Sequence, residues 1–166
     1  MRFFIKRHLM AVSILALLAT PMANAGELVP FRGRDAGVLF LDSVDFGLGV
    51  AVLLHEAEGH ATHLGKLRAA TTIIVDLTTG APVFISTTFR AANGDTLVTS
   101  EMPIGAPDPQ SIILRATIIG GTGRFAGAQG AYTSVTRGNK PLVVGNLPIR
   151  LTSIWDGAVS SPGANK

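Results

Sequence analysis

Histidine and glutamate side chains gather in the segment HEAEGHATH, which spans residues 55–63. These residue types can bind zinc or transfer protons, and His55, His60 and His63 are the candidate ligands. A zinc protease of the His-Glu-x-x-His type holds two histidines four residues apart on a helix, so that both imidazoles reach one ion. Here His55 and His60 are five residues apart, and Gly59 interrupts the segment. The spacing argues against a zinc-protease site.

The residues on either side of the histidines favour a strand. Val50, Val52 and Leu54 alternate with other residues, and the β-branched run ATTIIV follows at 70–75. Such residues are enriched in strands. A strand directs successive side chains to opposite faces, so the three imidazoles would not converge on one ion. We therefore predict no metal site in this segment.

Parity along this strand predicts which histidine faces the interior. His63 falls on the same face as Ala61, Gly65 and Leu67, whose small and apolar side chains are typical of a barrel lumen. We expect His63 to be either a hydrogen-bonded core histidine or a polar group that lines a pocket. His60 falls on the opposite face, where we expect it to be in solvent.

Four further residues are candidates for a ligand site. Glu101 and Arg115 lie in apolar segments, and a buried charge needs a partner. We expect the two to pair across neighbouring strands, either as a structural ion pair or as a polar anchor or proton donor for a ligand. Tyr132 and Trp155 are the only Tyr and Trp, and each either fills the core or stacks on a ligand. With His63, they complete the predicted lumen site.

Other chemistries have little support. The chain has no Cys, and it has no Gly-x-Ser-x-Gly nucleophile motif. The stretch GGTGRFAG at 120–127 lacks the Lys-Ser/Thr and the glycine spacing of phosphate-binding loops. We interpret it as a structural turn in which Phe125 closes one end of a barrel. No catalytic residue is assigned, and no metal or cofactor is expected.

Residues 1–25 are typical of a cleaved secretory signal peptide. Arg2, Lys6 and Arg7 precede an apolar run at 9–19, and Ala-Asn-Ala at 23–25 matches the site of signal peptidase. The apolar run is shorter than the roughly 20 residues that span a bilayer. We predict that residues 26–166 form one domain in the periplasm or outside the cell, with no membrane insertion after cleavage.

The charge of the mature chain argues against a nucleic-acid partner. The leader contains three of the 14 basic residues and no acidic residue, which leaves 11 residues of each sign. No cluster of Lys and Arg remains to displace counterions from a phosphate backbone.

Without Cys, the domain has no disulfide, and its stability must come from burial. The sequence does not determine the oligomeric state, and a homo-oligomer is compatible with it.

Short Thr-, Val- and Ile-rich runs separated by Gly, Asn and Pro indicate an all-β domain. No segment combines an amphipathic helical pattern with a cap. We predict a closed antiparallel barrel of about eight strands, with a two-sheet sandwich as the alternative. Asn93-Gly94 is expected to form a tight hairpin turn, and residues 158–166 a frayed tail. The expected strands are 37–41, 46–56, 60–77, 82–91, 96–102, 111–119, 129–137 and 147–156.

Four segments together resemble secreted bacterial proteins of the allene oxide cyclase barrel-like type, and the glycine-rich turn also resembles that of plant dirigent proteins. The segments are EGHATHLGKL, TFRAANGDTL, IIGGTGRFAGAQGAY and WDGAVSSPG. The resemblance implies an eight-stranded antiparallel barrel with a central cavity. It also implies that related barrels steer cyclisation or coupling of hydrophobic intermediates, but it assigns no catalytic residue here.

Three functions follow from these observations. The first is an exported barrel that binds a small hydrophobic molecule in its lumen. The second is an isomerase or cyclase that confines its substrate beside one acid or base. The third is a structural or interaction barrel without a ligand. A large cavity inside the barrel would favour the first two functions over the third.

Overall fold

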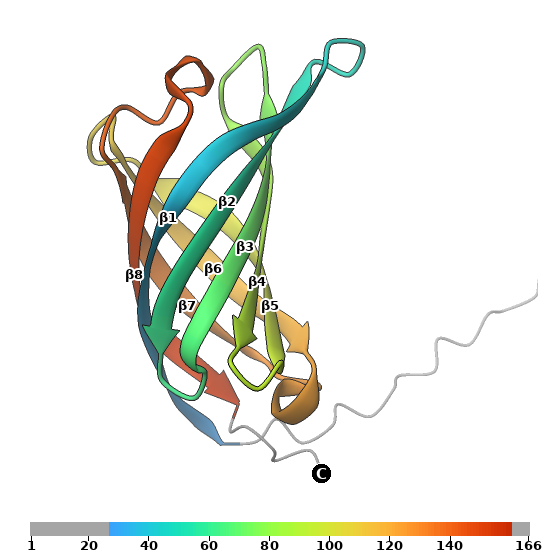
Figure 1. Cartoon of the computed structure of the whole chain (residues 1–166), viewed down its shortest axis with the longest axis vertical. Helices are drawn as coiled ribbons and strands as arrows, with labels where there is room; N and C mark the ends of the chain where they lie inside the picture. Colours follow the sequence, from blue (N-terminus) through green and yellow to red (C-terminus); the bar gives the residue numbers. More distant parts are fainter. Residues whose placement is uncertain (1–26, 161–166) are drawn as a thin grey trace, which may run out of the picture.

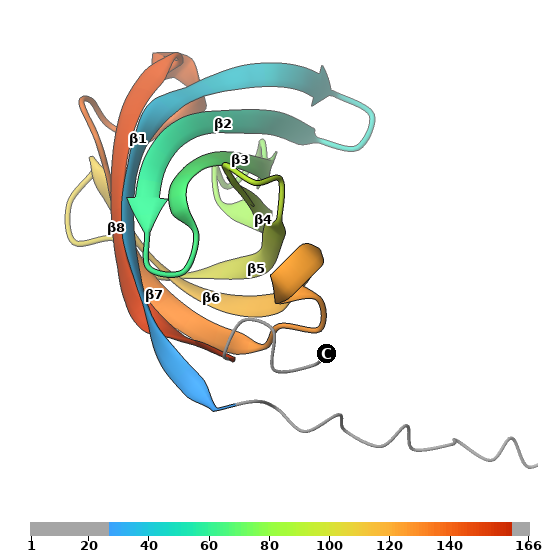
Figure 2. The same cartoon turned by 60° about the horizontal axis from the view of Figure 1, so that its bottom comes forward.

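Eight strands follow one another along the chain, and each pairs with the next in antiparallel fashion. The computed structural model describes residues 27–160, so the predicted leader lies outside the described residues. Figures 1 and 2 show the strands wound into a barrel. The strands are β1 (Leu28–Asp45), β2 (Val50–Ala61), β3 (Gly65–Asp76), β4 (Pro82–Ala91), β5 (Thr96–Gly105), β6 (Ser111–Gly121), β7 (Gly130–Gly138) and β8 (Ile149–Ser160).

Pairing between β1 and β8 closes the barrel. Their register runs from Leu28 opposite Ser160 to Leu39 opposite Ile149. Each strand therefore has a neighbour on both sides, and the sheet has no free edge. The predicted closed barrel of eight antiparallel strands is confirmed, and the alternative of a two-sheet sandwich is wrong.

Alternation of buried and exposed side chains explains why these segments form strands. Along β7 and β8, every second residue is buried, from Tyr132 to Gly138 and from Ile149 to Trp155. The residues between them are exposed on the outer face. Period-two burial of this kind is compatible with a strand and not with a helix.

Some of the strand boundaries differ from the prediction. β1 begins at Leu28 rather than at residue 37, because pairing with β8 recruits a segment in which Arg32 and Arg34 face outward. The predicted strand at 60–77 is interrupted by a turn at Thr62–Leu64. The expected frayed tail also begins too early, since β8 continues to Ser160 and pairs with β1.

Two connections contain short helical turns. The 3-10 turn η1 (Gly123–Phe125) connects β6 to β7, and η2 (Val144–Asn146) lies between β7 and β8. Within residues 27–160, no helix is long and apolar enough to cross a membrane. The predicted hairpin at Asn93-Gly94 is present, with Gly94 at φ 90° and its N–H donating to Ala91 O at 2.9 Å.

An aromatic cluster fills the end of the barrel at which η1, the start of β1 and the end of β8 lie (Figure 1). Phe31, Phe89, Tyr132 and Trp155 contact one another, with ring centroids 5.2–6.3 Å apart. Phe125 from η1 is 1% exposed and belongs to the same cluster, as the sequence predicted. This end of the barrel is therefore closed by side chains.

A second apolar cluster lies nearer the opposite end. Its buried members lie on strands, and three of its partly buried members belong to the β7–β8 connection. The buried residues are Leu39, Ala51, Leu53, Val75, Ile149 and Leu151, and the partly buried ones are Val44 and Ile73 on strands and Leu142, Val144 and Leu147 in the connection. In Figure 1 the β7–β8 connection is at the top, together with the β1–β2, β3–β4 and β5–β6 connections. The two clusters leave a section of the lumen between them that carries polar side chains.

The absence of a side chain at Gly33 makes room for the aromatic cluster. A Cβ atom at Gly33 would lie 2.3 Å from Cζ2 of Trp155 and 2.8 Å from Cβ of Ala61. Contacts this short do not occur without movement of the neighbouring atoms. The indole ring of Trp155 therefore lies directly against the backbone of β1.

Substitution of Gly33 by Ala should destabilise the barrel. We expect the free energy of unfolding to fall by about 1–3 kcal/mol, because a new methyl group overpacks a filled region. Urea denaturation measures the loss, and the emission of Trp155 reports the displaced ring. Gly145→Ala is the matched control, because a Cβ there has no atom within 4 Å. Equal stability of the two variants would contradict the packing described here.

Candidate functional site

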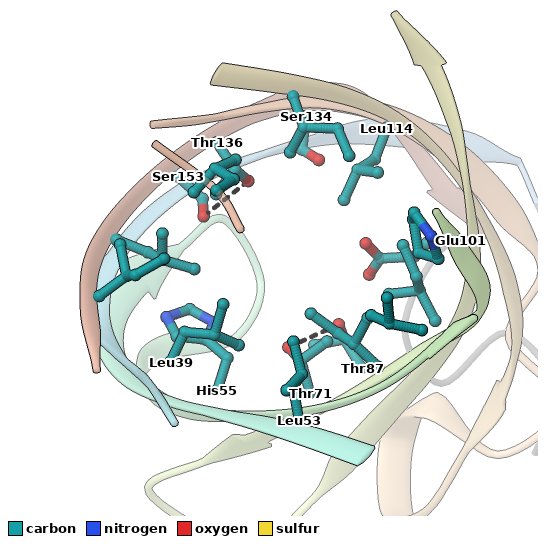
Figure 3. Close-up of a pocket in the computed structure, with 18 of the residues that line it drawn as sticks. Leu39, Leu53, His55, Thr71, Thr87, Glu101, Leu114, Ser134, Thr136 and Ser153 are labelled. Atoms are coloured by element: carbon teal, nitrogen blue, oxygen red, sulfur yellow. Dashed lines mark hydrogen bonds between the residues drawn. The ribbon is translucent and has the colours of Figure 1, made fainter. Parts of the chain in front are cut away.

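A cavity of about 140 Å³ lies inside the barrel, and residues from all eight strands line it. Figure 3 shows polar side chains that point into this space from different walls. Leucine, isoleucine and valine residues line much of the rest of the cavity. The polar lining residues are Asp35, His55, Thr71, Thr87, Glu101, Tyr132, Ser134, Thr136 and Ser153.

Two pairs of hydroxyl groups in the wall form hydrogen bonds, each within its own pair. Thr71 and Thr87 face each other across β3 and β4, and their Oγ1 atoms are 2.9 Å apart. Thr136 lies opposite Ser153 across β7 and β8, and its Oγ1 donates to Ser153 Oγ at 3.0 Å. Register therefore pairs these groups before any ligand is present.

Glu101 is the hydrogen-bond acceptor for two neighbouring hydroxyl groups. Its Oε1 accepts from Thr99 Oγ1 at 2.9 Å and from Tyr132 Oη at 3.0 Å. Burial, followed by the charge of Glu101, raises the pKa of Tyr132 well above its usual value, and the hydrogen bond with Thr99 opposes this rise. Tyr132 thus remains a protonated phenol that donates to Glu101.

Asp35 is a carboxyl group with an unusual protonation equilibrium. Burial raises the pKa of Asp35 to about 6, a hydrogen bond from Ser153 opposes this rise, and the charge of Glu101 adds to it. Its buried Oδ1 has no hydrogen-bond partner. Asp35 can therefore exchange a proton near neutral pH, which an ordinary aspartate cannot do.

His55 lies in the same cavity as a neutral imidazole. Burial lowers the pKa of His55 to about 4, because the imidazolium form would lose its hydration. Only 5% of the residue is exposed, and Nε2 has no hydrogen-bond partner. At neutral pH, His55 offers a ligand a hydrogen bond but no charge.

Asp35 and His55 were not among the lumen residues predicted from the sequence. His55 was considered only as a metal ligand, although the sequence contains a signal that it faces the lumen. Parity from Ala61, which we predicted to face the lumen, already assigns His55 to the same face of β2. Asp35 has the same parity along β1 as the inward-facing Phe31 and Leu39. It lies, however, in the segment 28–36, which we did not predict to be a strand. No such signal existed for Asp35, since its strand became evident only through the pairing of β1 with β8.

Three of the predicted site residues line the cavity. Glu101, Tyr132 and Trp155 all contribute to its wall. Trp155 is 5% exposed, and its Nε1 has no hydrogen-bond partner. These three residues come from β5, β7 and β8, so the closed barrel brings together side chains that are distant in sequence.

The prediction that His63 faces the lumen is wrong. His63 lies in the turn between β2 and β3, with a positive φ of 66°, and it is exposed. Its Nε2 donates to Pro30 O at 3.1 Å, outside the cavity. The reversal of the chain at residues 62–64 breaks the parity on which the prediction relied. His60 is exposed as predicted, so the three histidines lie on different sides of the wall.

The predicted pairing of Glu101 with Arg115 is also wrong. Arg115 lies opposite Met102 in the β5–β6 register, whereas Glu101 lies opposite Ala116. This difference of one residue directs the Arg115 side chain to the outer face, where it is exposed. Arg115 does not line the cavity.

The charges of the cavity wall have one sign. Asp35 and Glu101 are the carboxyl groups that line it, and none of the lining residues is Lys or Arg. In the described part of the chain, the ion pairs are Arg32–Asp156, Arg68–Glu58, Arg124–Asp95 and Arg137–Asp108. Within the same residues, no group of three or more His, Asp or Glu side chains is arranged to hold a metal ion.

Comparison with known proteins gives a structural likeness. No protein-family model matches the sequence, and no curated protein matches it. Among solved structures, the pterocarpan synthase dirigent protein GePTS1 is similar, with a TM-score of 0.48 and 12% sequence identity. The match covers 82% of this chain and 87% of that chain. The likeness concerns the β-barrel fold, which the strand pairing of this chain establishes independently.

Substitution of Asp35 by Asn should stabilise the protein at alkaline pH. The pKa of Asp35 rises from 3.8 to about 6 on folding, so the folded state is weakened as pH increases through this window. Above pH 6 the buried carboxylate costs up to about 3 kcal/mol, and below pH 3.8 it costs nothing. Urea denaturation at pH 8 should therefore show a higher free energy of unfolding for Asp35→Asn, with a smaller difference at pH 4.5.

Acidification should reduce the free energy of unfolding of Asp35→Asn more than that of the unmodified chain. The pKa of His55 falls from 6.5 to about 4 on folding, so stability from neutral His55 is lost as pH decreases through that window. In the unmodified chain, protonation of Asp35 offsets much of this loss, whereas Asp35→Asn lacks the offset. Exposed Asp42→Asn is the control. Lower stability of Asp35→Asn than of the unmodified chain at pH 8 would contradict the assigned burial.

Proposed function

We propose that this chain binds a small, largely apolar molecule inside its barrel and orients that molecule with a few polar groups. The observation that carries the proposal is the cavity of about 140 Å³ inside the barrel, with both apolar and polar lining residues. An engineered apolar cavity of about 150 Å³ in another protein accommodates benzene. A ligand of about one substituted ring therefore matches the available space.

The unpartnered atoms in the wall support a ligand rather than an empty core. Asp35 Oδ1, His55 Nε2 and Trp155 Nε1 are buried without a hydrogen-bond partner. Native proteins leave few buried polar groups unsatisfied, because each such group costs about 1–3 kcal/mol. A ligand with a polar group would satisfy part of this set. The purely structural barrel, which needs no cavity, explains these atoms less well.

We also propose that the chain acts after export, in the periplasm or outside the cell, and without inserting into a membrane. The support is the leader pattern at residues 1–25. N-terminal sequencing of the exported protein should find Gly26 as the first residue. A chain that retains residues 1–25 would contradict the proposal.

A second candidate function is isomerisation or ring closure of the bound molecule. It is favoured by Asp35, whose pKa of about 6 allows it to donate or accept a proton near neutral pH. The resemblance of the sequence to allene oxide cyclase barrel-like proteins is in keeping with this chemistry. The protein would then act by confining one conformer of its substrate beside a single acid.

Filling the cavity should weaken binding. Nitrobenzene quenches indole fluorescence, and Trp155, the only Trp, lines the cavity. We expect quenching by nitrobenzene to saturate, and Ser134→Phe to weaken the binding at least tenfold because the new ring occupies the cavity. Thr133→Phe is the matched control on the outer face of the same strand. Quenching that never saturates, with no molecule that co-purifies, would favour a barrel with a structural role.

Catalysis is tested on any molecule that co-purifies with the protein. The isomer composition of that molecule is followed by chiral chromatography during incubation with the unmodified chain, with Asp35→Asn and with Asp42→Asn. If Asp35 transfers the proton, Asp35→Asn should bind the molecule and convert it at least a hundredfold more slowly. Recovery of an unchanged molecule, or equal rates for all three proteins, would exclude this role of Asp35.

A further inference from the structure

The two carboxyl groups of the cavity have no cationic partner among residues 27–160. Asp35 comes from β1 and Glu101 from β5, and each lines the cavity. The ion pairs of residues 27–160 involve neither of them, and no Lys or Arg contributes to the cavity wall. A negative charge in an apolar enclosure is costly unless a positive charge lies nearby. The described part of the chain does not supply that charge.

The carboxyl groups influence each other across the shared space. The charge of Glu101 raises the pKa of Asp35, and both carboxyl groups raise the pKa of Tyr132. Like charges in a low dielectric repel each other strongly, and a cation between them would relieve the repulsion. His55 is the other titratable group on the wall, and it is neutral at pH 7.

Two deeply buried side chains independently support the binding of a ligand in the cavity. His55 and Trp155 are each 5% exposed, both line the cavity, and His55 Nε2 and Trp155 Nε1 lack partners. Figure 3 shows His55 and Glu101 on opposite walls, with open space between their side chains. A ligand in that space would lie within an enclosure that offers hydrogen bonds from one wall and negative charge from another.

Aromatic rings form the floor of the same cavity. Phe89, Tyr132 and Trp155 line it, and the Phe89 and Trp155 centroids are 5.2 Å apart. The faces of Trp and Tyr rings attract cations, and aromatic rings are a common means of recognising alkylammonium groups. The combination of carboxylate and aromatic groups therefore matches an organic cation better than it matches a neutral molecule of the same size.

We propose that the lumen selects a small hydrophobic cation, namely an aromatic or aliphatic amine or quaternary ammonium compound whose charged group lies between Asp35 and Glu101 above the aromatic floor. This inference rests on the proposed function, because it names the class of molecule that the cavity binds. An inorganic cation fits less well, since the described residues offer no cluster of three ligating side chains and the rest of the wall is largely apolar.

Two probes of equal shape test the inference. Phenyltrimethylammonium and tert-butylbenzene differ in one central atom, which is a positively charged nitrogen in the first and a neutral carbon in the second. Each is titrated at pH 8 as a competitor of nitrobenzene, with Trp155 fluorescence as the readout. We expect the cation to bind at least tenfold more tightly than its neutral counterpart.

Removal of either carboxylate should reduce the preference for the cation. Asp35→Asn and Glu101→Gln are each expected to weaken phenyltrimethylammonium binding about tenfold and to leave tert-butylbenzene binding nearly unchanged. Glu56→Gln is the matched control, because Glu56 follows His55 on β2 but faces solvent. Affinity for the cation should also rise as pH increases through 6, where Asp35 ionises in the presence of Glu101, Tyr132 and His55.

The possible outcomes separate the two proposals. If tert-butylbenzene binds as tightly as the cation or more tightly, the charge selectivity is wrong, while the lumen remains a binding site. If neither probe displaces nitrobenzene and nitrobenzene itself does not saturate, the proposed function fails as well. Cation binding that persists unchanged in both carboxylate variants would locate the cation elsewhere and would overturn the inference.

Discussion

The hydrogen bonds between β1 and β8 close the sheet, and closure decides what the inward-facing side chains experience. In an open sheet, Asp35 would lie near an edge and would be hydrated. In the closed barrel it lies inside a wall that excludes most water, so its ionisation becomes costly and its pKa rises to about 6. The same closure removes the hydration of His55. There it disfavours the protonated imidazolium form, so the pKa of His55 falls to about 4. The chemistry of the lumen therefore depends on a long-range pairing of the first and last strands.

The interior separates packing from recognition along the barrel axis. The aromatic cluster around Phe31 and Trp155 fills one end, and an aliphatic cluster around Leu53 and Ile149 lies toward the other. These clusters provide the apolar burial that a domain without disulfides requires. The section between them reduces the stability of the fold, because its buried polar atoms lack hydrogen-bond partners. Loss of stability at one place in an otherwise satisfied wall is the pattern expected of a binding site.

Sequence patterns predicted the fold more successfully than they predicted the site. Alternation of β-branched and polar residues and the Gly- and Asn-containing turns indicated eight strands, and Glu101, Tyr132 and Trp155 do line the cavity. His63 failed because parity cannot be carried through a turn that the pattern did not reveal. Arg115 failed because a difference of one residue in strand register moves a side chain from the inner to the outer face.

Local properties were thus determined by the sequence alone: the strand periodicity, the tight turn at Asn93-Gly94, the aromatic residue that closes one end, and the lack of disulfides. The tertiary structure alone decided that Asp35 and His55 line one cavity with Glu101, although Asp35 and Glu101 are 66 positions apart in the sequence. The reason is physical. Periodicity depends on neighbouring residues, whereas solvation and charge in the lumen depend on which distant strands pair and on whether the sheet closes.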